Sequence, residues 1–378
     1  MTTTVRPRSP AELAVLVPYQ LGYHPGPSVV LTVLRDRRLG MLQRHDLLSD
    51  PDACRQAAQQ ALAIIAHEGA TALVVIAFEE EGGSSAPLRQ AMLAAADEAD
   101  LPVREHVVVR GGRWSAPDCD EPCCPEEGLP LPRPEDVPAV AAFVHAGVAP
   151  FASREALVDS VLPPGDVGRA REVDLHLRTL GRGAATETFG GAPTAPPWSW
   201  LERAGDVVEG WVRLIDPAPG ALPVADLDDA VLARVAASLQ DVRWRDLLMG
   251  ALCPGTMPVG CLDEPGHDLA LVAVARCPWT GEGVEDTGGV ARERAEEVLA
   301  VRTRLVDLVR LLPEHAAPPV LTLIAHLGWW AGDGTVAAVC LERTLAVDPG
   351  YRLAELMLRL LSAGVRPWEV DRAAPEAA

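Results

Sequence analysis

The stretch Thr71–Phe78, TALVVIAF, is apolar at every position after its first residue. A half-exposed strand would alternate polar and apolar side chains, and this stretch does not. It therefore predicts a central strand that helices cover on both faces.

The segments around this strand predict the remaining elements of one sheet. Further strands are expected over Ser28–Leu34, Leu39–Leu47 and Val103–Val109, and helices from Pro51 to Gly69 and from Pro87 to Ala99. The resulting order of strand, strand, helix, strand, helix, strand predicts an α/β domain with a mixed sheet and packed helices. Before the hairpin, an apolar helical turn over Ala11–Val17 is expected to stop at Pro18.

The rest of the chain is predicted to be mainly helical. Helices are expected over Glu135–His145, Ser153–Leu162, Asp166–Leu180, Asp226–Leu239, Val242–Leu252, Arg292–Leu312, Val320–Trp330, Thr335–Val347 and Tyr351–Ser362. Leu269–Val274 is interpreted as a short strand or part of a loop, and the segment around Trp198, Trp200 and Trp211 is left unassigned.

Composition shifts divide the chain into two expected domains. We predict an α/β domain over residues 1–180, a linker over 181–204, a mainly helical domain over 205–370 and a frayed tail over 371–378. The linker prediction rests on its Gly- and Pro-rich, aperiodic sequence. In the helical domain, Ala337, Leu341, Leu345 and the turn at Asp348–Pro349 resemble the second helix of a tetratricopeptide unit, so a helix pair of that kind is expected.

Charge and hydropathy exclude some classes of partner. The formal net charge is −20, and all 33 basic residues are arginine. Phosphate-backbone binding depends on clustered cations, so we expect no nucleic-acid partner. No segment approaches the ~20 continuous apolar residues of a membrane span, and we expect a cytoplasmic protein without a membrane partner. In a reducing cytosol its eight cysteines are expected to be thiols or metal ligands.

The least ordinary segment is Gly111–Pro132, GGRWSAPDCDEPCCPEEGLPLP, which holds three cysteines and five prolines. Three interpretations stay open for Cys119, Cys123 and Cys124. The first is a zinc site, for which a fourth ligand would come from His106, His145, Cys54 or Asp118. The second is a redox disulfide such as Cys119–Cys123. The third is a proline-pinned loop whose small thiols pack on the sheet, with Trp114 as a plug.

Acidic and small residues follow the central strand. Glu79, Glu80 and Glu81 stand where α/β sheets collect ligands, and paired carboxylates there can hold Mg²⁺ or act as acid and base. The following Gly82–Ser85 leads into a helix N-terminus, which favours anions instead. These two hypotheses conflict, and a solvated charged loop is the alternative to both.

Two classes of function follow from these observations. The repeat-like C-terminal helices favour an interaction or regulatory protein without catalytic activity, with Trp329 and Trp330 as candidate interface residues because both are hard to bury on one helix face. Burial of both in the core is the competing interpretation. The alternative function is a metal- or thiol-dependent enzyme built around Cys119, Cys123 and Cys124.

Four stretches together resemble one known family. They are PYQLGYHPGPSVV at 18–30, RHDL at 44–47, GRWSAPDCDEPCCPEEGLP at 112–130 and LIAHLGWWAGDGTVAAVCLERTLAVDPGYRLAELM at 323–357. The chain is similar to the actinobacterial domain-of-unknown-function family numbered 4192, and departs from its pattern at Gln20 and His45. The resemblance implies an actinobacterial, cytoplasmic protein, and it implies no activity and no catalytic residue.

Overall fold

The computed structural model describes residues 7–35, 38–67, 69–119, 125, 127–145, 148–160, 166–185, 204–257, 264–280, 294–365 and 367. The chain folds as two compact units, Met1–Leu157 and Val158–Ala378. Each unit is described by itself below.

The first unit is built on a six-stranded sheet, which confirms the mixed α/β prediction. Its strands are β1 (Ser28–Arg35), β2 (Arg38–Asp46), β3 (Ala72–Glu79), β4 (Val103–Arg110), β5 (Arg113–Ser115) and β6 (Leu129–Pro130), in the order β2-β1-β3-β4-β5-β6. Only β3 and β4 pair in parallel, and the other pairs are antiparallel. The apolar stretch is therefore the central strand, paired with β1 on one side and β4 on the other.

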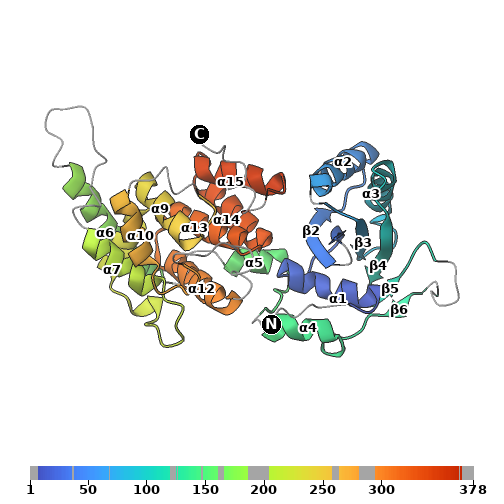
Figure 1. Cartoon of the computed structure of the whole chain (residues 1–378), viewed down its shortest axis with the longest axis horizontal. Coiled ribbons are helices and arrows are strands. Elements are labelled where there is room, and N and C mark those ends of the chain that lie inside the picture. The colour runs from blue at the N-terminus through green and yellow to red at the C-terminus, as the bar shows by residue number, and fades with distance from the viewer. Residues whose placement is uncertain are drawn as a thin grey trace. The chain divides into compact units, whose positions relative to one another are not determined.

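Helices cover both faces of this sheet, as the unbroken apolar sequence of β3 requires. On one face lie α2 (Pro51–His67) and α3 (Ala86–Glu98), and on the other lie α1 (Pro10–Leu21) and α4 (Pro138–His145), as Figure 1 shows. Side chains from β1, β3, α2 and α3 form one apolar core, including Leu31, Ile65, Val75, Leu88 and Met92. A short turn of 3-10 helix, η1 (Pro134–Asp136), precedes α4.

The expectation that the first helix stops before Pro18 was wrong. α1 continues through Pro18 to Leu21 and ends at Gly22, which adopts a left-handed φ of 80°. Proline in a helix interior costs about 3 kcal/mol. Pro18 and six other residues of α1 are buried, and contacts with β4 and α4 offset the lost hydrogen bond.

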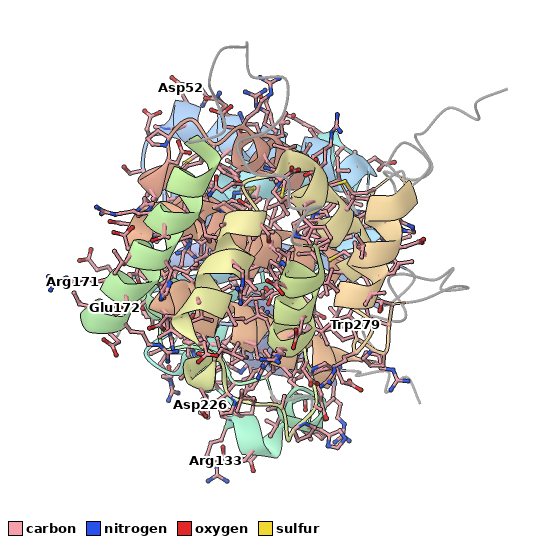
Figure 2. All side chains as sticks on the ribbon, turned by 90° about the vertical axis from the view of Figure 1, so that its left-hand side faces the viewer. Asp52, Arg133, Arg171, Glu172, Asp226 and Trp279 are labelled. Atoms are coloured by element: carbon pink, nitrogen blue, oxygen red, sulfur yellow. The ribbon has the colours of Figure 1, made fainter. Side chains whose placement is uncertain are left out.

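The second unit is helical throughout its described residues, which confirms the fold class predicted for this half. Its helices are α5 (Arg154–Ser160), shared with the end of the first unit, α6 (Val167–Ala185), α7 (Ala204–Leu214), η3 (Val224–Asp226), α8 (Asp229–Ser238), α9 (Val242–Leu252), α10 (Glu264–Ala273), α12 (Ala295–Leu311), η5 (Glu314–Ala316), α13 (Ala317–Trp330), α14 (Gly334–Val347) and α15 (Arg352–Ser362). Arg171 and Glu172 of α6 point outward, and Trp279 follows α10 (Figure 2).

Two assignments in this half differ from the sequence analysis. Leu269 to Ala273 form the end of helix α10 and Val274 follows it directly, so the strand-or-loop interpretation was wrong. Helix α10 packs on α7 and α9, and those contacts select the helix for a short apolar run. The unassigned segment around Trp211 is helix α7. Trp211 is fully buried there and donates from its indole Nε1 to Ser238 Oγ.

The predicted domain boundaries at residues 180 and 205 stay predictions. Helix α6, which the sequence analysis grouped with the α/β domain, contacts α8 and α12 of the second unit. Most of the predicted linker, and the predicted frayed tail, lie outside the described residues.

Candidate functional site

The carboxylate of Glu79 closes the turn between β3 and α3. Its oxygens accept hydrogen bonds from the backbone N–H of Gly83 and Ser85, both at 3.0 Å, and from the Ser85 hydroxyl. Burial opposes ionisation most strongly, yet these hydrogen bonds and the charge of Arg89 together leave the pKa of Glu79 below its usual value. The side chain is only 2% exposed, so an ionised group is held inside the protein by its partners.

A directional chain of hydrogen bonds runs from this carboxylate across the unit to the cysteine segment. Arg89 Nε donates to Ser85 Oγ at 2.7 Å, and Arg89 Nη1 donates to Nε2 of His106 at 2.6 Å. Because arginine only donates, Nε2 of His106 accepts, and the ring hydrogen lies on Nδ1. Nδ1 then donates to Oδ2 of Asp118 at 2.6 Å. We call Glu79, Ser85, Arg89, His106 and Asp118 the relay.

The relay decides between the hypotheses for the loop after β3. Glu79 itself occupies the backbone N–H groups that would otherwise bind an anion at the start of α3. Its lone pairs are engaged, so it is not free to act as a base, whereas Glu80 and Glu81 are exposed. The solvated-loop interpretation describes Glu80 and Glu81, but for Glu79 it was wrong, because three donors stabilise that buried charge.

His106 also has a structural role. It is buried, and both ring nitrogens are engaged, one facing Arg89 inside the unit and the other facing Asp118 at the surface. A general base needs a free nitrogen within reach of a substrate proton. The relay therefore has the geometry of a structural connection between the sheet and Asp118, and not the geometry of a catalytic dyad.

The two arms of the cysteine segment are tied together at their base. β5 pairs with β6 through Trp114 and Leu129. Arg113 reaches across and donates from Nε to Glu127 O at 2.9 Å and from Nη2 to Gly128 O at 2.7 Å. Gly128 has a φ of 73°, and a Cβ there would lie 2.7 Å from Trp114 O, so only glycine fits. Trp114, expected to be a buried plug, is only partly buried.

The structure places the candidate zinc ligands as follows. Cys119 is partly exposed and follows the relay residue Asp118, whereas Cys123 and Cys124 lie outside the described residues. Of the four proposed fourth ligands, His106 and Asp118 bond to each other, Cys54 is buried on α2, and His145 is exposed at the end of α4. Over the described part of the chain, no three His, Cys, Asp or Glu side chains converge as a metal site would require.

Trp329 and Trp330 are both buried, so of the two interpretations left open for this pair, burial in the core is the one that the structure favours. Each indole N–H donates a hydrogen bond to a different backbone carbonyl: Trp329 Nε1 donates to Val365 O at 2.9 Å, and Trp330 Nε1 donates to Pro254 O at 3.1 Å. Every residue of α13 is buried, so the helix has no solvent face and adjacent tryptophans can point to different neighbours. The exposed interface that the pair suggested is absent from this helix.

His326 of the same helix is buried and hydrogen-bonded to a hydroxyl. Thr256 Oγ donates to Cys253 O at 2.7 Å, so it accepts from His326 Nε2 at 2.8 Å. Burial lowers the pKa of His326 from 6.5 to about 4. The imidazole is therefore neutral in the folded protein at neutral pH.

Acid is expected to destabilise the helical unit through His326. Between pH 6.5 and about 4 the unfolded chain binds a proton at this position and the folded chain does not. The free energy of unfolding should therefore fall as the pH drops through that window, by about 3 kcal/mol in total. Urea denaturation at several pH values checks this. His326→Gln, which keeps an N–H donor for Thr256, should show a smaller fall, and equal pH dependence in both proteins would contradict the assignment.

Helix α15 carries the exposed apolar surface of the terminal helices. Ala354 and Met357 are buried, and α15 contacts α13 and α14. Leu356 and Leu360, however, are 43% and 38% exposed, and Leu353 is partly buried. The sequence predicted a helix here, over Tyr351–Ser362, but not this exposed surface. The signal was present, since Leu353, Leu356, Leu358, Leu360 and Leu361 are more leucines than one buried stripe of this helix can hold.

Comparison with known proteins gives one family. The model described as Domain of unknown function (DUF4192) matches residues 10–282 and 288–368. No curated protein and no solved structure matches the chain. Among the described residues, no helix is both long enough and apolar enough to cross a membrane.

Proposed function

Because the chain belongs to the family described as Domain of unknown function (DUF4192), which carries no stated activity, we propose its function from its surfaces: it is an interaction protein whose helical unit binds a helical segment of a partner. The observation that carries this proposal is the apolar face formed by Leu353, Leu356 and Leu360 on α15, which we call the leucine face. Each exposed leucine removed from water would contribute about 1–2 kcal/mol to binding.

The arrangement of the helices supports a helical partner. Helix α14 is covered by α13 on one side and α15 on the other, and α15 packs on this pair with its Ala354–Met357 side. A further helix laid on the leucine face would continue the same packing. The proposal concerns this face because its three leucines follow one another at intervals of three and four residues, whereas the exposed Val167 and Leu175 of α6 lie eight residues apart and Val242 and Val272 lie on different helices.

Site-specific photocrosslinking in the host cell tests the proposal. A photoreactive benzoylphenylalanine in place of Leu356 should give a discrete protein adduct, and the same residue in place of Val272 of α10 should not. Both positions are exposed, at 43% and 53%, so accessibility does not distinguish them. Adducts of the same pattern and yield at both positions would contradict a specific partner at α15.

The cysteine segment carries a second candidate function, a metal site or thiol centre. What favours it is the tied base of the loop: the β5–β6 pairing, the Arg113 bonds and the Asp118 end of the relay hold both arms in place. Thiolates on a pre-formed loop bind Zn²⁺ with less loss of chain entropy. Catalysis at such a centre would further require an open coordination position.

Elemental analysis with a native thiol count tests this candidate. The expected result for a metal centre is about one zinc per chain, with Cys119, Cys123 and Cys124 protected from a thiol reagent until a chelator is added. Cys340→Ser serves as the control, because Cys340 is fully buried on α14, is not among the candidate ligands and should not change the metal content. A metal-free chain whose three loop thiols react at once would exclude zinc.

A further inference from the structure

We propose that the leucine face binds an amphipathic helix with acidic residues beside its apolar seam, and not a second copy of this chain. The inference rests on the function proposed above and adds the chemistry of the partner.

The leucine face has the spacing of a helix–helix seam. Leu353, Leu356 and Leu360 follow one another at intervals of three and four residues, the pattern that places side chains along one line of a helix. A partner helix with apolar residues at the same intervals would interdigitate with them. The seam extends for about two turns, so charges at its borders contribute a large share of specificity.

The two borders of the seam differ. On one side Ala354 and Met357 are buried against the protein's own helices. On the other side lie Arg352 and Arg359, each directly before a seam leucine and each exposed. In the described part of the chain neither guanidinium has an ion pair within 4.0 Å. Glu355, the only acidic residue of α15, lies further round the helix from the seam than the two arginines.

The positive charge of this border predicts the sign of the charge that flanks the apolar seam of the partner helix. Residues that flank an apolar seam meet the flanking residues of the opposing helix and pair by charge. Carboxylates opposite Arg352 and Arg359 would form ion pairs, whereas lysines there would repel them. The border therefore predicts Glu or Asp at the flanking positions of the partner.

A second copy fits this border poorly. Two α15 helices packed antiparallel through their leucine faces would set the arginine border of one copy against that of the other. Like charges in such positions are destabilising. The net charge of −20 adds a long-range repulsion between copies. That repulsion also slows an acidic partner, but it is screened beyond about 8 Å at physiological salt, so the contact charges decide the docked state.

Two synthetic helical peptides test the inference with the full-length chain. Both carry leucines at seam spacing, and they differ only in having Glu or Lys at the flanking positions. The Glu peptide should bind about tenfold more tightly, the difference that a few exposed ion pairs supply. The double variant Arg352→Glu/Arg359→Glu should reverse this preference. Both positions are exposed, so the variant should fold, and circular dichroism checks that it does.

The possible outcomes test the charge of the partner and the proposed binding function separately. Equal affinity for both peptides would overturn the acidic partner and leave the binding face intact. Sedimentation of the chain alone is expected to show a monomer at micromolar concentration. A dimer that Leu356→Glu dissolves would identify a second copy as the occupant and overturn the inference. Binding of neither peptide, without self-association, would overturn both the inference and the proposed function.

Discussion

Replacing Glu79 by alanine should lower the free energy of unfolding of the α/β unit by about 3 kcal/mol. The change removes the acceptor for the Gly83 and Ser85 N–H groups and for the Ser85 hydroxyl. It also leaves the half-buried charge of Arg89 without its nearby carboxylate. Such losses are large because buried donors and charges are then neither paired nor hydrated. Loss of native-state protection in the amides of β3 and β4, followed by hydrogen exchange against urea, measures the effect in this unit directly.

The next residue provides the matched control for this prediction. Glu80 is exposed, so Glu80→Ala should change the free energy of unfolding by less than about 0.5 kcal/mol. A second comparison separates the effect of the charge from the effect of side-chain volume. Glu79→Gln keeps the shape of the side chain but loses its charge, and its loss in free energy of unfolding should fall between those of the two alanine variants. Equal, small effects of Glu79→Ala and Glu80→Ala would show that the relay does not stabilise the unit.

Trp330→Ala should destabilise the helical unit by about 3–5 kcal/mol, the usual cost of removing a large buried aromatic side chain. Trp330 is 1% exposed, its ring centroid lies 6.1 Å from that of Trp279, and its indole N–H bonds to Pro254 O. The variant leaves a cavity and an unpaired carbonyl together. Urea denaturation followed by the fluorescence of the remaining tryptophans measures the change.

The exposed leucine of α15 gives the comparison for Trp330. Leu356→Ala should cost less than about 1 kcal/mol, because 43% of the residue is already in water. If Trp330→Ala were as mild as Leu356→Ala, Trp330 would not be a core residue, and its earlier interpretation as an interface residue would return.

Regular elements of this fold could be predicted from the sequence because their patterns are local. The hairpin β1–β2 and strands β3 and β4 lie within about a residue of where alternation and apolar runs place them, and α9 begins at Val242 and ends at Leu252 as predicted. The failures have tertiary causes. α1 passes through Pro18 because buried contacts outweigh a lost hydrogen bond, and α10 is a helix because of its neighbours.

The candidate sites were harder to predict, since they depend on distant residues. Sequence patterns pointed to the cysteine segment and to Glu79, and to His106 and Asp118 only as candidate zinc ligands. The relay, which joins Glu79 to Asp118 through His106, depends on contacts that no local pattern shows. The adjacent Trp329 and Trp330 suggested an exposed interface, but both are buried because α13 is covered on all sides. The exposed apolar face lies two helices further on, on α15, which carries more leucines than one buried stripe can hold.

Isothermal titration calorimetry with the acid-flanked leucine peptide measures whether the leucine face of α15 binds a partner helix. Leu356→Glu/Leu360→Glu should abolish binding by the full-length chain, and circular dichroism checks that the variant is folded. The control Val242→Glu/Val272→Glu changes two valines that are 56% and 53% exposed elsewhere in the same unit, and it should bind like the unmodified chain. Equal affinities of the two double variants would contradict the claim.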